Sequence, residues 1–148
     1  MKKIGWKSRH GWVIVLFFIT FLALTRGAAW GEDWKFCTQS KDGTMYYYDA
    51  ARVTHVSKEV LKFWGRAVLS PEAVKKFVKI DPKFAGLHHI TSLVEMNCTE
   101  RKRRSLWIIF YDKNGVAIEN VDITPAESDW EIILPESAQE DLLDALCE

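Results

Sequence analysis

Three cysteines are the residues with the clearest chemistry in this chain of 148 residues. Cys37, Cys98 and Cys147 allow one disulfide and one remaining thiol, and three different pairings are open. Disulfides persist in oxidising compartments and are rare in the cytoplasm, so this chemistry depends on export. The role of the cysteines therefore depends on the N-terminal segment, which decides the compartment.

A second candidate feature is a run of four basic residues, Arg101, Lys102, Arg103 and Arg104, which follows Glu100. Such a run is typical of a solvated turn between two strands. The alternative is a cationic patch that binds acidic partners, such as sulfated glycans, matrix proteins or anionic lipid headgroups. We retain these four residues as a candidate patch for a polyanion or another partner.

No motif in the chain predicts catalysis, a metal or a cofactor. Nucleophile-elbow, zinc-protease, phosphate-loop and Cys-x-x-Cys motifs are all missing from the sequence. His88 and His89 are adjacent and point different ways on a strand, and no third ligand stands at a useful spacing. Residues 112–115 contain oxygen ligands but are typical of a turn, and residues 46–48 are tyrosines that a strand divides between its two faces. We therefore predict a non-enzymatic protein without metal or cofactor.

Residues 1–31 have the pattern of a secretory signal peptide. A basic region without acids precedes an apolar run at 12–24, and small residues follow it. The run is shorter than the roughly 20 residues that span a bilayer. Ala29 and Gly31 predict cleavage after Gly31, with cleavage after Ala29 as the second choice. The alternative is an N-terminal anchor that is not cleaved.

Removal of this segment changes the charge of the chain. The full sequence balances 20 Lys+Arg against 20 Asp+Glu, but residues 1–31 contain five of the basic residues and no acid. The domain predicted at 32–148 is therefore mildly acidic, which disfavours nucleic-acid binding. No cysteine follows the apolar run closely, so a lipid anchor is disfavoured. We expect a periplasmic or secreted protein that meets the membrane only through its signal segment.

Alternation of apolar and polar residues dominates residues 32–148 and predicts β-strands. The predicted strands are 34–39, 44–48, 60–69, 90–98, 105–112 and 116–123, with an edge segment at 130–134. Gly43 and Gly115 lie in two segments that predict hairpin turns. Both faces of strand 105–112 are apolar, so we expect this strand to be central and covered on both sides.

Two helices complete the predicted domain. Ser70 and Pro71 are an N-cap and a first helical residue, and they open a short helix. Ser137 and Glu140 form a capping box that opens the last helix. The sequence therefore predicts an α+β fold: a single antiparallel sheet of about six strands, with a C-terminal helix packed on it and one short additional helix.

The predicted elements favour one cysteine pairing. Cys98 lies on the apolar face of its strand, Cys147 lies beside the apolar stripe of the last helix, and Cys37 falls on a polar alternation. We therefore predict a disulfide between Cys98 and Cys147, which fastens the helix to the sheet. Cys37 is then either an unpaired thiol tucked into the domain or a thiol that forms an intermolecular bridge in a dimer.

The order of several motifs resembles the surface-adhesin protein E family of Gram-negative bacteria. The matching features, from about residue 34 to 147, are Trp34, Tyr47-Tyr48-Asp49, Trp64, Glu95-Met96-Asn97-Cys98 with Arg101-Lys102, Tyr111 and Gly115, Trp130, Ile133, Pro135, Ser137 and Leu146-Cys147. The resemblance implies an antiparallel six-stranded sheet with a C-terminal helix, which agrees with the fold expected from the alternation.

The resemblance also implies a function of the binding type. The namesake adhesin is an outer-membrane lipoprotein that forms dimers and binds host extracellular-matrix proteins and plasminogen, whereas this chain lacks the lipoprotein cysteine. We therefore expect an exported, non-catalytic envelope protein that binds a macromolecule, with a host matrix protein and a homodimer as the partners that the resemblance implies. The alternatives are a periplasmic structural or assembly protein and a small-molecule carrier.

Overall fold

The computed structural model describes residues 31–123 and 129–147. The predicted export signal lies outside this part of the chain, except for Gly31. No helix among the described residues is long and apolar enough to cross a membrane. The elements in chain order are β1 (Trp34–Gln39), β2 (Met45–Asp49), η1 (Ala50–Arg52), β3 (Thr54–His55), β4 (Val60–Val68), α2 (Pro71–Ile80), η2 (Pro82–Gly86), β5 (Leu87–Asn97), β6 (Lys102–Asp112), β7 (Ala117–Asp122), β8 (Glu131–Ile132) and α3 (Ala138–Leu146).

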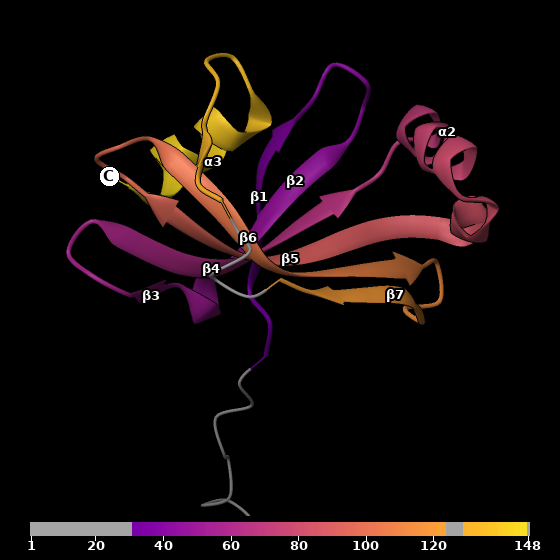
Figure 1. Ribbon diagram of the computed structural model, residues 1–148, viewed down its shortest axis with the longest axis horizontal. Helices are drawn as coiled ribbons and strands as arrows, with labels where there is room; N and C mark the ends of the chain where they lie inside the picture. The colour runs from indigo at the N-terminus through magenta and orange to yellow at the C-terminus, as the bar shows by residue number, and fades with distance from the viewer. Residues whose placement is uncertain (1–30, 124–128, 148) are drawn as a thin grey trace, which may run out of the picture. The chain divides into compact units, whose positions relative to one another are not determined.

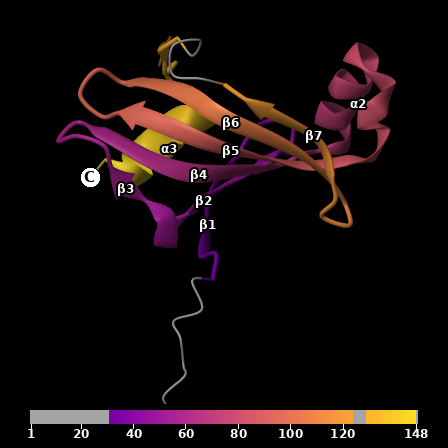
Figure 2. The same ribbon diagram turned by 60° about the horizontal axis from the view of Figure 1, so that its bottom comes forward.

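One antiparallel sheet forms the frame of the domain. Its main strands are ordered β1-β2-β4-β5-β6-β7, and the short strands β3 and β8 pair with β4 and β6. Helices α2 and α3 both lie over the same face of the sheet, near opposite ends of it (Figure 1 and Figure 2). The predicted α+β fold, with a C-terminal helix packed on an antiparallel sheet and one short additional helix, is confirmed.

Local signals in the sequence explain where several elements begin and turn. Gly115 has φ +78°, a conformation that favours glycine, and the Asp112 carboxylate accepts a hydrogen bond from the Val116 amide at 2.9 Å. Ser70 caps α2, because its hydroxyl accepts a hydrogen bond from the Ala73 amide at 3.1 Å. The hairpin turn and the start of α2 are therefore as predicted.

The strand register divides the side chains between two faces. On one face, Phe63 of β4 opposes Val94 of β5, and both pack under α3. We call this side, which carries α2 and α3, the helix face. On the other side, Trp64 opposes Leu93, and Arg66 is next along β4. We call this second side, to which these residues belong, the open face, because no helix of the described chain covers it.

The prediction that strand 105–112 is covered on both sides is wrong. The helix-face side chain Phe110 packs against Phe77 of α2, with ring centroids 6.0 Å apart, but Trp107 and Tyr111 lie half-exposed on the open face. The physical reason is that these aromatic rings carry polar groups and tolerate partial contact with water. The apolar alternation therefore does not require a second layer of helices.

The predicted disulfide is confirmed, since Cys98 and Cys147 are joined across a sequence separation of 49 residues. The bridge connects the residue after β5 to the residue after α3. The adjoining core is formed by Phe63, Val94, Met96, Ile133, Leu142 and Leu143. The bridge therefore holds α3 on the helix face at the end where the chain terminates.

Cys37 lies on the helix face and not on a polar side of β1. Its side chain packs against the core beneath α3, and burial, followed by the charge of Asp141, raises the pKa of its thiol. The pairing of β1 with β2 shifts between Phe36 and Thr38, which is the irregularity expected of a β-bulge. The aromatic side of β1 faces outward, and Cys37 is an unpaired thiol tucked into the domain, as one of the two alternatives expects.

We predict that removal of the disulfide strongly destabilises the domain. A cross-link that closes a loop of this length stabilises the folded state by up to about 4 kcal/mol in the chain-entropy model. Cys147→Ala should lower the free energy of unfolding by a large fraction of this amount in urea titrations. Cys37→Ala is the matched control and should cost only about 1 kcal/mol.

Peptide mapping by mass spectrometry without reductant checks the connectivity on the same protein. A cross-linked peptide that contains Cys98 and Cys147 is expected. A cross-link within the chain that contains Cys37 would contradict the structure, whereas a cross-link between two copies through Cys37 would support the intermolecular bridge, which stays a prediction.

Candidate functional site

Three tryptophans form a row across the open face. Trp34 of β1 opposes Asp49 of β2, whereas Trp64 of β4 opposes Leu93 of β5, and Leu93 in turn opposes Trp107 of β6. Adjacent strands are about 4.8 Å apart, so the tryptophans on β4 and β6 are about 10 Å apart. All three are half-buried. This row gives the open face a broad aromatic surface that is partly in contact with water.

Two arginines cover parts of this aromatic row. The guanidinium of Arg66 lies 3.8 Å from the ring centroid of Trp34, and that of Arg52 lies 5.9 Å from Trp64. The Glu32 carboxylate accepts hydrogen bonds from Trp34 Nε1 at 2.7 Å, Arg66 Nη2 at 3.3 Å and Arg52 Nη2 at 3.2 Å. The bond from Trp34, assisted by the two cations, lowers the pKa of Glu32. The cluster is therefore ordered, and its two guanidinium groups are balanced by the carboxylates of Glu32 and Asp49.

Asp49 is the buried residue that holds one arginine of this cluster in place. Its side chain is fully buried and accepts hydrogen bonds from the amides of Asp33 at 3.0 Å and Ala51 at 3.1 Å, and from Arg52 Nε. Burial by itself raises the pKa of Asp49, but these hydrogen bonds outweigh it and hold the pKa below its usual value. The carboxylate caps η1 and fixes the position of Arg52 beside Trp64.

Two polar atoms near the centre of the open face have no hydrogen-bond partner among the described residues. They are Arg66 Nε and Thr91 Oγ1, and their residues oppose each other on β4 and β5. Thr91 is only 7% exposed. Buried polar atoms in native proteins are nearly always paired, so two unpaired buried atoms on neighbouring strands are unusual.

The structure disperses the four basic residues predicted as a patch. Three of them lie within β6, where alternate side chains point to opposite faces of the sheet. Each residue forms an ion pair with a glutamate: Arg101 with Glu140, Lys102 with Glu100, Arg103 with Glu131, and Arg104 with Glu95. The positive charge of the run is therefore largely balanced locally, and Arg104 also lies over the Trp130 ring at 4.7 Å.

The remaining candidates from the sequence take structural positions. Tyr46 opposes Ala67 on the helix face and Tyr47 opposes Arg66 on the open face, so the tyrosines are divided as predicted. His88 and His89 approach each other at 3.2 Å between their Nδ1 atoms, and His89 stacks on Tyr111 at 4.8 Å. Within residues 31–123 and 129–147, no group of three or more His, Cys, Asp or Glu side chains is placed to hold a metal.

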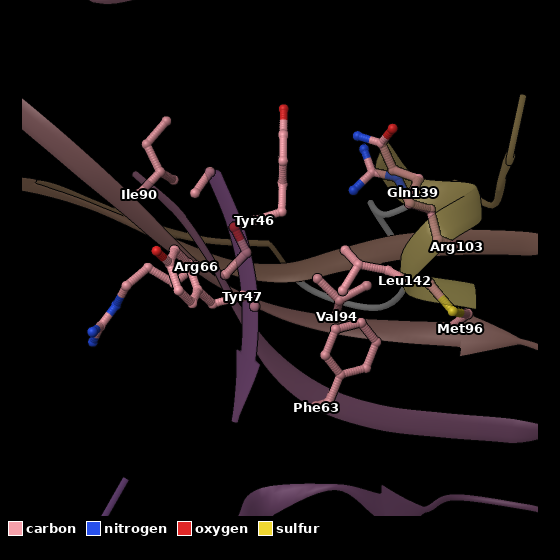
Figure 3. Close-up of a pocket in the computed structure, with 13 residues that line it drawn as sticks. Tyr46, Tyr47, Phe63, Arg66, Ile90, Val94, Met96, Arg103, Gln139 and Leu142 are labelled. Carbon is pink, nitrogen blue, oxygen red and sulfur yellow. The ribbon is translucent and has the colours of Figure 1, made fainter. Parts of the chain in front are cut away.

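A hollow on the helix face is the second surface feature of interest. It lies beside α3, and its labelled walls include Tyr46, Ile90, Val94 and Leu142 (Figure 3). Its volume is 80 Å³. Binding pockets for drug-sized ligands are several times larger, at about 300–1,000 Å³, so the hollow does not support the carrier alternative for a ligand of that size.

Neither the open face nor the hollow brings together the nucleophile, base and polarising groups that catalysis requires. The domain is a one-sided antiparallel sheet that presents an aromatic surface, which is the character of a binding protein. A family model, described as surface-adhesin protein E, matches residues 34–148, and the chain belongs to this family. That family is a class of surface binding proteins rather than enzymes. No curated protein and no solved structure matches the chain.

Sequence reasoning weighed the tyrosines but did not single out the tryptophan row or the residues that hold it. Trp34, Trp64 and Asp49 were named among the features of the family resemblance without a binding role, and Glu32 was not named. One signal for Asp49 was available, because an aspartate that ends a strand and precedes a helical turn is typical of an N-cap. Thr91 and its missing partner carry no sequence signal.

We predict that the buried carboxylate of Asp49 makes the free energy of unfolding fall as the pH is lowered into the acid range. Its pKa is lower in the folded chain than in the unfolded chain, so its stabilisation is complete above the unfolded value of about 3.9. The stabilisation is lost as the pH falls through the still lower folded-state value. Asp49→Asn should cost about 2 kcal/mol at neutral pH and should flatten this acid limb in urea titrations. An unchanged acid limb in the variant would contradict the assignment.

Proposed function

We propose that this protein is an exported, non-catalytic envelope protein that binds a macromolecule through the open face of its sheet. In this proposal residues 1–31 are a signal peptide cleaved near Gly31, and residues 32–148 are the binding domain. The observation that supports it best is the row Trp34, Trp64 and Trp107, which remains half-exposed and is flanked by stacked arginines. Tryptophan and arginine, together with tyrosine, are the residues that most often dominate the energetics of binding interfaces.

Charge considerations favour the open face over the basic run as the main contact. The four basic residues are each engaged by a carboxylate. A partner that covers the open face removes the half-exposed tryptophan rings from water, a favourable contribution that exposed ion pairs do not offer. Host matrix proteins and plasminogen are the partner classes that the family resemblance implies.

We predict that binding depends on the tryptophan row. Trp64→Ala and Trp107→Ala should each weaken binding to immobilised matrix extract or plasminogen by at least about tenfold, because each removes a large aromatic contact. Ile80→Ala is the control, since Ile80 is an exposed apolar residue of α2 outside the open face. Circular dichroism and urea titration establish that the variants are folded. Wild-type binding by both folded tryptophan variants would contradict the proposal.

The basic run is tested separately as a candidate patch. Replacement of Arg101, Lys102, Arg103 and Arg104 by alanine should reduce binding only about threefold if the ion pairs are mainly structural, since exposed ion pairs contribute little. A loss that is large and disappears at high salt would instead assign the partner to this run. A surface plasmon resonance series at increasing salt separates the two outcomes.

Cell fractionation tests the compartment of the protein, and light scattering tests its oligomeric state. The proposal requires a processed protein in the periplasm, in the outer membrane or in the medium, and an unprocessed cytoplasmic protein would overturn it. In the structural or assembly alternative, a second copy of the chain covers the open face. A dimer that is lost in Trp64→Ala and Trp107→Ala would favour that alternative.

A further inference from the structure

The helix face contains a hollow that is produced by a change in side-chain size along β4 and β5. The inward residues of β4 change from Leu61 and Phe63 to Gly65 and Ala67, and Ser92 of β5 opposes Gly65. The large residues pack beneath α3, whereas the small ones leave space beside it. A Cβ atom added at Gly65 would make only ordinary contacts, at 3.6 Å or more, so the backbone does not require glycine there. The space is therefore a consequence of side-chain choice.

The size and walls of the hollow fit a compact aliphatic group. Its volume of 80 Å³ is about half that of an apolar cavity that takes up benzene, which is about 150 Å³. Ile90, Val94, Leu142 and Phe63 provide apolar walls. An isobutyl-sized group fits such a space, while the remainder of a ligand extends through the open side.

The same hollow is bordered by groups that donate hydrogen bonds. Arg103 of β6 and Gln139 of α3 both line it, and Figure 3 shows their polar ends on the side of Leu142 away from Phe63. Arg103 is paired with Glu131 at 3.2 Å, and because the Glu131 side chain is 67% exposed, this ion pair contributes little energy for a second anion to overcome. No hydrogen bond of the Gln139 side-chain amide is formed within the described chain. A guanidinium beside an amide is suited to a carboxylate head.

We propose that this hollow is a binding site for a short branched aliphatic carboxylate. The alkyl end enters between Ala67, Ile90 and Leu142, and the carboxylate meets Arg103 and Gln139 at the rim. The site lies on the helix face and is independent of the macromolecular contact proposed for the open face. The volume of the hollow limits the alkyl end of this ligand to about the size of an isobutyl group.

The test uses ¹⁵N-labelled protein purified from cells that express the full chain, and 4-methylpentanoate as the probe. The probe should shift the amide signals of Gly65, Ala67 and Ser92 and should raise the melting temperature. Ala67→Leu places an isobutyl group inside the hollow and should weaken binding by at least about tenfold. Ala117→Leu makes the same change on the exposed strand β7 and is the matched control. Ser92→Leu replaces Ala67→Leu if the latter does not fold.

A second arm tests the recognition of the carboxylate. Arg103→Gln should weaken binding of 4-methylpentanoate but should leave binding of 4-methylpentanol unchanged. The site is overturned if the probe shifts none of these amides at millimolar concentration, or if Ala67→Leu and Ser92→Leu bind as well as Ala117→Leu. Equal binding of the acid and the alcohol by the wild-type protein overturns the assigned ligand class. These results do not depend on whether the open face binds a macromolecule.

Discussion

The packing of α3 on one face of the sheet is the contact on which the rest of the structure depends. A helix of nine residues is too short to be stable alone in water, so α3 exists because Leu142 and Leu143 are buried against the sheet. The Cys98–Cys147 bridge fixes the far end of this contact. Because the bridge requires an oxidising compartment, the same contact links the fold to the proposed export of the chain.

One-sided packing explains the character of the open face. Both helices of the described domain lie on the helix face, so the opposite face must be stable in contact with water. Two of its three tryptophans satisfy this requirement through hydrogen bonds of their Nε1 groups: Trp34 donates to Glu32 and Trp107 donates to Asn120. The buried carboxylate of Asp49 orders the arginine that lies beside the row. A surface of this kind is stable when exposed and still retains apolar area for a partner.

The sequence predicts the elements of this fold well, because the hydrophobic period and the capping and turn residues are local properties of the chain. The strand alternation, the cap at Ser70, the turn at Gly115 and the pairing of Cys98 all follow from neighbours in the chain. The covered side of a strand is a tertiary property. In β1, Trp34 and Phe36 form the side that looks apolar in the sequence, yet that side faces outward and Cys37 packs against the core.

The candidate site was less predictable for the same reason. The partners of Arg101 and Arg103 are glutamates 39 and 28 residues away in sequence, so the run looks uncompensated until the chain is folded. The cluster around Glu32 joins residues from three separate segments. The hollow depends on register, since only the pairing of β4 with β5 brings Gly65 next to Ser92.

The central claim is that the open face is uncovered in the isolated domain and covered by a partner in its natural setting. Hydroxyl-radical footprinting with mass spectrometry measures this directly, on the purified protein alone and on the protein with matrix extract or plasminogen. The account predicts that Trp64 and Trp107 are oxidised in the protein alone and protected with the partner, while Phe63, buried in the core beneath α3, is protected in both. Equal oxidation of the two tryptophans in both samples, or protection already in the purified monomer, would contradict the account.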